Sequence, residues 1–410
     1  MKRMINIALL SVSVLLFTAC FQTTPGSKKP DDPNLVRAGE QLNLLIQSID
    51  NKLNTEDEPE KGGDLSMFPR SLNMGGQLKL VPSKDWCSGF FAGCLWEMYG
   101  STGDKHWRES AIRFTEPLED QKLNGKTHDM GFKMMNTFGK GYELTGDKNY
   151  RDILVQSAKT LITRYNEKIG CIRSWDHNQD KWQFPVIIDN MMNLELLFWA
   201  SKETGDSVYY NIAVTHALTT MKNHFRSDNS CYHVVDYDAA TGAVVKKNTH
   251  QGFSDESAWS RGQAWALYGY TMVYRETKNP VFLTQAEKVA QYILAQPNMP
   301  VDLVPYWDFD APEIPNEPRD VSAAAIATSA LYELSLFVSD SLRTGYLKAA
   351  DQMFKNLSTS YLSAPGANNG FILGHSTGSK PHNSEIDVPI IYADYYYLEA
   401  LLRKMKSDRM

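Results

Sequence analysis

A short turn that joins an apolar helix to an amphipathic one recurs along this chain and constrains its fold more than any other feature. The tripeptide Thr-Gly-Asp stands at positions 102–104, 145–147 and 204–206, each time after an apolar stretch. Gly can close a helix in the left-handed conformation, and Asp can cap the helix that follows. Similar polar breaks follow at Glu276–Asn279 and Ser339-Asp340. The pattern predicts a series of helical hairpins.

The two helices of each hairpin differ in polarity. One is apolar nearly all round and the other on one side only, as an inner and an outer ring require. A helical solenoid would keep a nearly constant repeat length, whereas here the turns are unevenly spaced by large insertions. We therefore predict an all-α fold, an (α/α)6 barrel of six hairpins, in one domain over residues 34–406. The expected inner helices are Cys87–Tyr99, Met130–Leu144, Asn190–Lys202, Trp259–Arg275, Val321–Phe337 and Val388–Lys404.

The first 20 residues have the features of a bacterial export signal. Lys2 and Arg3 precede an apolar core, Ile5–Phe17, that is too short to span a bilayer. The sequence Leu-Phe-Thr-Ala-Cys resembles a lipobox, which makes Cys20 a lipidation site; an ordinary cleaved signal is the alternative. Residues 21–33 would be a tether. We predict a periplasmic or outer-membrane-anchored lipoprotein of a Gram-negative bacterium.

Composition narrows the class of ligand. The net charge of −6 gives no basic footprint for nucleic acid. Nine Trp and twenty Tyr suit the stacking of flat, half-apolar ligands such as sugars, although aromatic side chains also fill cores. The sequence therefore favours a carbohydrate over a nucleic acid.

The remaining cysteines do not form a metal motif. Cys87, Cys94, Cys171 and Cys231 include no Cys-x-x-Cys pair, and no two His have the spacing of metal ligands. We predict no metal and no cofactor. A disulfide between Cys171 and Cys231 stays open, and buried free thiols are expected elsewhere.

Each unusual polar cluster precedes an expected inner helix. In a toroid these helix N-termini face the same way, so the clusters meet at one cavity with the positive ends of the helix dipoles. Such a cavity suits an anionic ligand. The clusters are Lys84–Trp86, Thr127–Asp129, Asp189-Asn190, His250–Arg261 and Arg319-Asp320.

Asp129 and Asp189 are the candidate catalytic carboxylates. Helix capping is the alternative role for each of them. At Asp189 the helix end favours the charged form by less than about one pKa unit, while burial among aliphatic side chains can raise the pKa by up to about 3–5 units. We expect Asp189 to be the proton donor. Asp129, beside His128, is in the more polar setting and is expected to stay ionised.

Further polar and aromatic side chains are candidates for substrate binding. Arg261 and Trp265 share one helix face, where a guanidinium above an indole can hold a carboxylate and stack a sugar ring. The alternative is an ion pair of Arg261 with Asp255 or Glu256. His233 is expected at the rim of the cavity or behind it.

A late loop, Gly370–Asp387, enters the last helix. Its Ser376, Ser379, Lys380 and His382 can bind sulfate or carboxylate oxygens, and a solvated turn-rich loop is the alternative.

Taken together, six segments resemble the unsaturated glucuronyl hydrolases of glycoside hydrolase family 88, over most of the chain after the signal. That family has the six-hairpin barrel inferred above. The segments are FPRS (68–71), DWCSGFFAGCLW (85–96), HDMGF (128–132), DNMMNLELLFWAS (189–201), HFRSDNSCYHVVDYD (224–238) and THQGFSDESAWSRGQAW (249–265).

The resemblance implies hydration of the C4=C5 double bond that polysaccharide lyases leave in a terminal uronic acid. The acid at the position of Asp189 protonates C4 and activates water, and Asp129 matches the second essential carboxylate. The resemblance also implies that the substrates are unsaturated glycosaminoglycan oligosaccharides, with or without sulfate groups. The implied cavity positions are Trp86, His128, His233, Gln251, Arg261 and Trp265, with Trp175 as an added platform and the loop Ser376–Lys380 near the second sugar.

Two other functions compete with this one. The unsaturated rhamnogalacturonyl hydrolases share the toroid and act on pectin fragments. A glycan-capturing lipoprotein without catalysis would explain the anchor and the aromatic residues, but it gives no reason for two acids at one rim.

Overall fold

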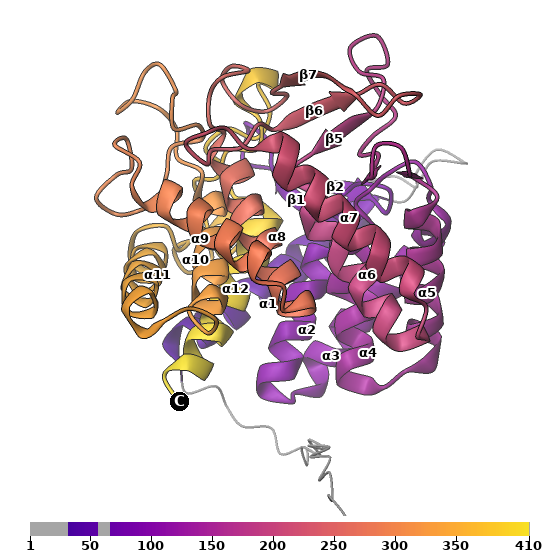
Figure 1. Ribbon diagram of the computed structural model, residues 1–410. Helices are drawn as coiled ribbons and strands as arrows, with labels where there is room; N and C mark the ends of the chain where they lie inside the picture. The colour runs from indigo at the N-terminus through magenta and orange to yellow at the C-terminus, as the bar shows by residue number, and fades with distance from the viewer. Residues whose placement is uncertain (1–31, 56–65, 410) are drawn as a thin grey trace, which may run out of the picture.

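The computed structural model describes residues 32–55 and 66–409. The expected signal peptide and nearly all of the expected tether lie outside them. The regular elements of the described residues are twelve α-helices, four short 3-10 or π-helical segments and seven short strands. The helices form two concentric rings, and a small sheet lies over one end of them (Figure 1).

Six helical segments form the inner ring. Each packs against the next, and the last, α12, packs against the first, α2, so that the ring closes. They are α2 (Phe90–Thr102), η2 (Gly131–Gly139) continued by α4 (Lys140–Thr145), α6 (Asn190–Thr204), α8 (Ser260–Thr277), α10 (Val321–Leu334) and α12 (Ile391–Ser407).

Each outer helix packs mainly on the inner segment of its own hairpin, and most also touch the next inner segment. The first helix of the chain, α1, pairs with the last, α12, so the hairpin that closes the barrel joins the two ends of the described chain. The prediction of an (α/α)6 barrel is confirmed. The outer helices are α1 (Pro33–Thr55), α3 (Lys105–Thr115), α5 (Lys148–Ile162), α7 (Ser207–His224), α9 (Pro280–Leu294) and α11 (Asp340–Ser360).

The Thr-Gly-Asp turns have the predicted geometry. Gly103, Gly146 and Gly205 have φ of 69°, 71° and 74°, and each closes the inner helix before it. The following Asp accepts a hydrogen bond from the backbone N–H two residues later and caps the outer helix. The turn between α10 and α11 has no left-handed residue at its helix end, since Ser335 is right-handed there.

The insertions contain strands that the sequence analysis did not predict, because most are too short to show an alternating pattern. The antiparallel sheet β5–β6–β7 lies directly before and beside the N-terminus of α6. The strands are β1 (Ser66–Leu72) with β2 (Leu78–Pro82), β3 (Tyr165–Asn166) with β4 (Cys171–Ile172), and β5 (Pro185–Ile187) with β6 (Val234–Tyr237) and β7 (Val244–Asn248). The short helices are η1 (Glu116–Leu123), η3 (Asn368–Gly370) and η4 (Lys380–His382).

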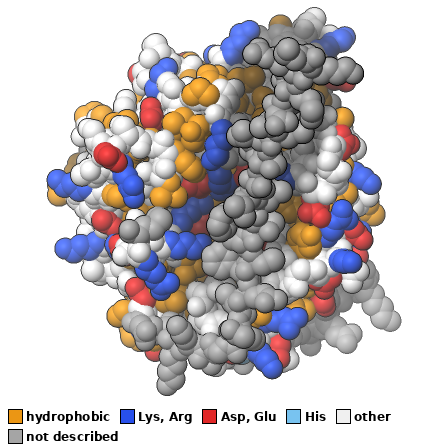
Figure 2. All heavy atoms as spheres, turned by 60° about the horizontal axis from the view of Figure 1, so that its bottom comes forward, with side chains coloured by type: hydrophobic (Ala, Val, Ile, Leu, Met, Phe, Trp, Pro, Cys, Tyr) orange, Lys and Arg blue, Asp and Glu red, His pale blue; other side chains and the backbone are white. Residues whose placement is uncertain are grey.

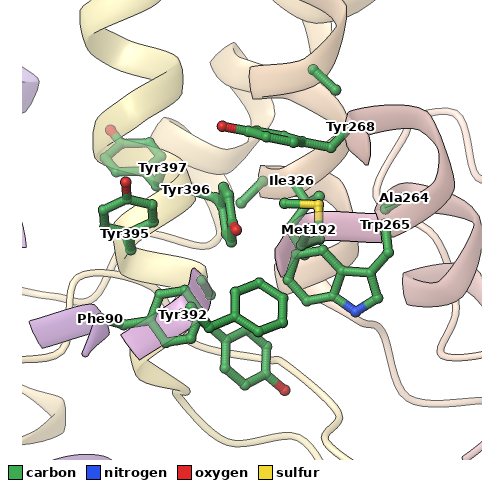
Figure 3. Packing of buried hydrophobic residues seen from close by; sticks show 14 of the residues in the cluster. Phe90, Met192, Ala264, Trp265, Tyr268, Ile326, Tyr392, Tyr395, Tyr396 and Tyr397 are labelled. Carbon is green, nitrogen blue, oxygen red and sulfur yellow. The ribbon is translucent and has the colours of Figure 1, made fainter. Parts of the chain in front are cut away.

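Aromatic side chains fill the middle of the inner ring. Trp265 from α8 and Tyr392, Tyr395 and Tyr396 from α12 are buried there (Figure 3). Phe90 from α2 meets Tyr395 edge to face, with 5.6 Å between ring centroids. Because this layer is packed, a cavity can form only at the ends of the ring.

A close approach of η2 and α6 brings the two candidate acids onto neighbouring inner helices. A Cβ on Gly131 would lie 2.6 Å from the Asn193 Cα, so only glycine fits. The Asn193 side chain accepts a hydrogen bond from the Phe132 backbone N–H at 2.9 Å. The η2 segment is a π-helix, a form often found next to functional sites.

Ion pairs gather at the end of the ring where the inner helices finish. Arg275 pairs with Glu195 and with Glu333, and Arg403 pairs with Glu333 at 2.8 Å. Lys140 pairs with Glu97 at 2.9 Å. Figure 2 looks toward this end and shows basic and acidic side chains interspersed on the surface.

The four cysteines of the described residues are buried free thiols. Cys171 and Cys231 do not pair, which resolves the disulfide that the sequence left open.

Candidate active site

A cavity of about 470 Å³ opens at the end of the ring where the inner helices begin. The segments that precede α2, η2, α6 and α8 line it, together with the late loop, so the predicted convergence of helix entries is observed for these four helices. Its lining includes Trp86, Lys126, Thr127, His128, Asp129, Phe132, Ser174, Trp175, His177, Ile187, Asp189, His250, Gln251, Arg261, Ser379, His382 and Ser384.

Asp189 does not cap its helix. It precedes α6 in helical geometry, and its side chain makes no capping hydrogen bond. The residue is 8% exposed, and its Oδ2 atom has no hydrogen-bond partner among the described residues. Burial raises the pKa of Asp189 to about 7; the charge of Arg261 opposes this rise and that of Asp129 adds to it. A carboxyl in this state can hold a proton near neutral pH.

His233 faces Asp189 as a neutral donor. Its Nδ1 atom accepts hydrogen bonds from the backbone N–H groups of His250 and Gln251, both at 3.1 Å. The ring proton therefore sits on Nε2, which lies 3.7 Å from Asp189 Oδ2. Burial holds the pKa of His233 well below its ordinary value, so the ring stays uncharged. His233 therefore lies behind Asp189 and outside the cavity lining, one of the two positions that the sequence suggested.

Asp129 has a different environment, with donors around it. Its Oδ2 atom accepts a hydrogen bond from the Thr127 hydroxyl at 2.8 Å, and its Oδ1 atom lies 3.3 Å from His128 Nε2. His128 Nδ1 lies 3.4 Å from the Asn193 amide, and burial lowers the pKa of the ring. A neutral His128 thus faces Asp129 with its N–H. The two acids share the cavity in unequal surroundings.

Arg261 is engaged within the protein. It is 1% exposed, forms an ion pair with Asp320, and donates to the backbone oxygens of Thr377 and Gly378. Its guanidinium lies over Trp259, 4.5 Å from the ring centroid. The predicted stacking on Trp265 is wrong, and so is the alternative of a pair with Asp255 or Glu256. Arg261 forms part of the cavity wall and fixes the late loop.

Of the three predicted tryptophans, two line the cavity. Trp86 packs against Phe132 and Tyr392, and Trp175 stacks on His177 with 5.0 Å between ring centroids. Trp265 is fully buried and lies outside the lining, so its expected contact with a sugar ring is a wrong prediction. Its indole instead lowers the pKa of Asp189, opposing the larger effect of burial.

The late loop contributes only part of the predicted set. Ser379 lines the cavity and its hydroxyl lies 2.7 Å from His382 Nδ1. Gln251, also in the lining, donates to Gly378 O at 3.2 Å. Ser376 is fully buried and Lys380 pairs with Glu317, and neither is in the lining. Sulfate binding by these two stays a prediction that the observed geometry does not favour.

Several lining residues were not singled out from the sequence. Lys126 and His177 lie on loops with no periodic pattern, and Ser174 follows a two-residue strand. Lys126 directly precedes the predicted Thr127, and His177 stands two residues after the predicted Trp175. Counting the two residues on either side of each predicted one as candidates would have included both. Within the described residues, no three His, Cys, Asp or Glu side chains cluster as metal ligands.

A helical toroid with two unequal carboxyls in an aromatic-lined cavity is typical of a carbohydrate-active hydrolase. Residues 67–400 match the model of Glycosyl Hydrolase Family 88. The chain therefore belongs to this family of glycoside hydrolases, and the prediction of an unsaturated glucuronyl hydrolase is confirmed.

Close relatives support the same assignment. An unsaturated glucuronyl hydrolase of Formosa agariphila is 49% identical over 98% of both chains. An unsaturated glucuronyl hydrolase of Bacillus sp. strain GL1 is 36% identical over 84% of this chain and 92% of its own. The crystal structure of an unsaturated glucuronyl hydrolase specific for heparin superposes with a TM-score of 0.85 at 46% identity, covering 93% of this chain and 99% of that one.

Proposed function

We propose that this enzyme hydrates the terminal unsaturated uronic acid of lyase-generated glycosaminoglycan fragments, heparin-derived ones first among them. The similarity to a heparin-specific hydrolase at 46% identity supports that preference. The chemistry rests on one observation: Asp189 is a buried carboxyl at the wall of the cavity, and one of its oxygens accepts no hydrogen bond from the residues that the structure describes.

In the proposed first step Asp189 gives its proton to C4 of the substrate. The positive charge that develops is shared between C5 and the ring oxygen. The Asp189 carboxylate then takes a proton from water as the water oxygen bonds to C5, which restores the acid. A single carboxyl can perform both transfers because its pKa of about 7 balances proton donation and proton acceptance near neutral pH.

The product of this addition is a hemiketal at C5. Its opening breaks the bond between C5 and the ring oxygen and leaves a ketone at C5. C1 then carries a hemiacetal, whose collapse releases the next sugar. Since no displacement occurs at C1, the carboxylate spacing that separates retaining from inverting glycosidases does not apply.

Asp129 has the second role in this proposal. With Thr127 and His128 donating toward its oxygens, it stays fixed and can hold ring hydroxyls of the sugar. Because Asp129 lines the same cavity, its negative charge also stabilises the positive charge that forms on C5 and the ring oxygen. Trp86 and Trp175 offer rings for stacking, Gln251 belongs to the polar wall, and His233 lies behind it next to Asp189.

The test is a panel of unsaturated disaccharides from heparin, chondroitin, hyaluronan and a lyase-treated pectin. We expect loss of the ultraviolet absorbance of the conjugated alkene with the glycosaminoglycan members, fastest with heparin-derived ones, and a free second sugar as product. Binding without absorbance loss would instead indicate a capture protein, and turnover of the pectin member alone would indicate the rhamnogalacturonyl type.

We also propose that the enzyme is a lipoprotein anchored through Cys20. Lys2, Arg3 and the apolar stretch that ends at this cysteine support the proposal. Among the helices of the described residues, none is long and apolar enough to cross a membrane. Labelling with radioactive palmitate should mark the full chain and not a Cys20→Ala variant, and equal labelling would refute the anchor.

A further inference from the structure

The late loop from Ser376 to Val388 is attached to the barrel at several points. Arg261 holds the carbonyls of Thr377 and Gly378, and the backbones of Ser376 and Val388 pair with each other. On the other side, Glu385 receives a two-point hydrogen bond from Arg70 of β1. The loop is therefore a fixed wall of the cavity.

All three ionic side chains of this loop are paired away from the cavity. Glu385 pairs with Arg70 and with Lys79. Asp387 pairs with His375 at 2.7 Å. Lys380 pairs with Glu317, and none of the three belongs to the cavity lining. The loop presents hydroxyl and imidazole groups to a ligand, from Ser379, His382 and Ser384, and no lysine, arginine or carboxylate.

Glu317 is the residue that holds the Lys380 ammonium group away from the cavity. Its side chain is fully buried, and it accepts hydrogen bonds from Trp307 Nε1 at 2.8 Å and from the Glu313 backbone at 3.2 Å. Lys380 Nζ lies over the Trp307 ring, 5.6 Å from its centroid. Yet Ser379 and His382, the neighbours of Lys380, do line the cavity, so its four-carbon side chain begins at the cavity wall and turns away.

We propose that Glu317 is a specificity-determining residue: by holding Lys380 outside the cavity, it makes the enzyme prefer fragments whose second sugar carries no sulfate against the late loop. A sulfate placed there would lose hydration and gain hydroxyl and imidazole contacts from the loop without the Lys380 ammonium, while the Arg261 guanidinium is already paired with Asp320. Sulfates at other positions are not affected, since Lys126 lines the cavity from the segment before η2. This inference rests on the proposed function.

The experiment uses unsaturated heparin disaccharides in matched pairs, with and without the 6-O-sulfate and with and without the N-sulfate. For each pair the ratio of kcat/KM for the sulfated and the unsulfated member is measured from the absorbance loss. We expect the wild-type ratio to be tenfold or more below one for at least one pair. In Glu317→Gln, Lys380 is released, and that ratio should rise about tenfold.

A double-mutant cycle isolates the lysine. Lys380→Ala alone should leave every ratio unchanged, because the ammonium does not reach the wild-type cavity. Lys380→Ala added to Glu317→Gln should remove the gain. Should the buried Glu317→Gln variant fail to fold, Ser384→Lys provides the same test, since it introduces an ammonium directly into the lining and should raise the same ratio.

The outcomes separate cleanly. A fall in the turnover of a sulfated substrate by Lys380→Ala in the wild-type background would overturn the inference, as would ratios that stay within twofold in Glu317→Gln and Ser384→Lys. No turnover of any disaccharide would refute the proposed function and this inference with it, whereas turnover with flat ratios refutes the inference alone.

Discussion

The two ends of the barrel bury acidic side chains in opposite ways. Where the inner helices begin, Asp189 is buried with a free oxygen, and its pKa rises to about 7. Where they finish, Glu333 is as well buried, but Arg403 and Arg275 outweigh the effect of burial and lower its pKa. The helix dipole would favour the reverse, because anions are stabilised at helix N-termini.

The difference shows which force acts at each end. Desolvation of an unpaired carboxyl exceeds the dipole effect of less than about one pKa unit. A paired carboxyl keeps its charge despite burial because two guanidinium groups replace the lost water. The first end can therefore hold a proton near neutral pH, as the proposed proton transfer requires, and the ion pairs of the second end stabilise the fold.

Asp189→Asn should have the largest effect on the reactive end. The amide has the size of the acid but cannot donate its proton to C4, so kcat should fall by about 10³-fold, within the usual range for a general acid. Asp206→Asn, at a cap on the outer surface, is the matched control and should keep full activity. If Asp189→Asn retains a tenth of the wild-type kcat, Asp189 is not the proton donor.

Arg275→Met tests the paired end. Its loss leaves Glu195 and Glu333 without one of their cations, which should lower the free energy of unfolding by about 3 kcal/mol without a change in kcat. Urea unfolding measures the change. Arg113→Met breaks an exposed pair with Asp50 and should cost less than about 1 kcal/mol. Equal losses in the two variants would contradict the contrast between buried and exposed pairs.

The pH dependence of turnover should report the titration of Asp189. Below pH 7 the acid is protonated and kcat should reach a plateau on this side of the profile. Above about pH 7 the carboxyl loses its proton, so kcat should fall about tenfold per pH unit, or on the order of 100-fold by pH 9. Circular dichroism at pH 9 must show that the fold persists. A kcat that increases up to pH 9 would exclude a proton donor with this pKa.

The same pKa makes a prediction for stability. Between the ordinary pKa of 3.8 and about 7, the folded protein keeps the Asp189 proton that the unfolded chain releases. Folding stability therefore falls as pH rises through this window. Asp189→Asn lacks this loss, so its advantage over wild type should grow by about 4 kcal/mol between pH 4 and pH 8. Thermal melts at both pH values measure the change, and a constant difference would argue that Asp189 is already ionised.

Much of the fold was predictable because it depends on local chemistry. Gly103 and Asp104 determine a helix end and a helix start within a few residues, and the same pair recurs. The position of Asp189 followed from its place before an apolar helix. The sequence did not reveal that its side chain leaves the helix N–H groups uncapped, since capping depends on a rotamer.

The errors concern partners that are distant in the sequence. Arg261 was expected near Trp265 because four residues separate them, but the guanidinium turns toward Asp320 and Trp259. Lys380 was a candidate for binding sulfate or carboxylate oxygens of a ligand, but in the structure it pairs with Glu317, 63 residues away. Local spacing predicts which side chains share a helix face, and it cannot predict which distant charge they meet.

The smallest expected effect separates a capping carboxylate from a catalytic one. Asp206 precedes α7 as Asp189 precedes α6, but Asp206 accepts a hydrogen bond from the Val208 N–H at 2.9 Å. Asp206→Ala should lower the free energy of unfolding by about 1 kcal/mol, and Asp206→Asn by less, because asparagine also caps. Neither substitution should change kcat, since Asp206 lies beyond the C-terminal end of α6, whereas the cavity lies at the N-terminal end of α6. A loss of activity in Asp206→Ala without a loss of stability would mean that the two ends of the barrel are coupled. The two ends could then not be treated as independent regions.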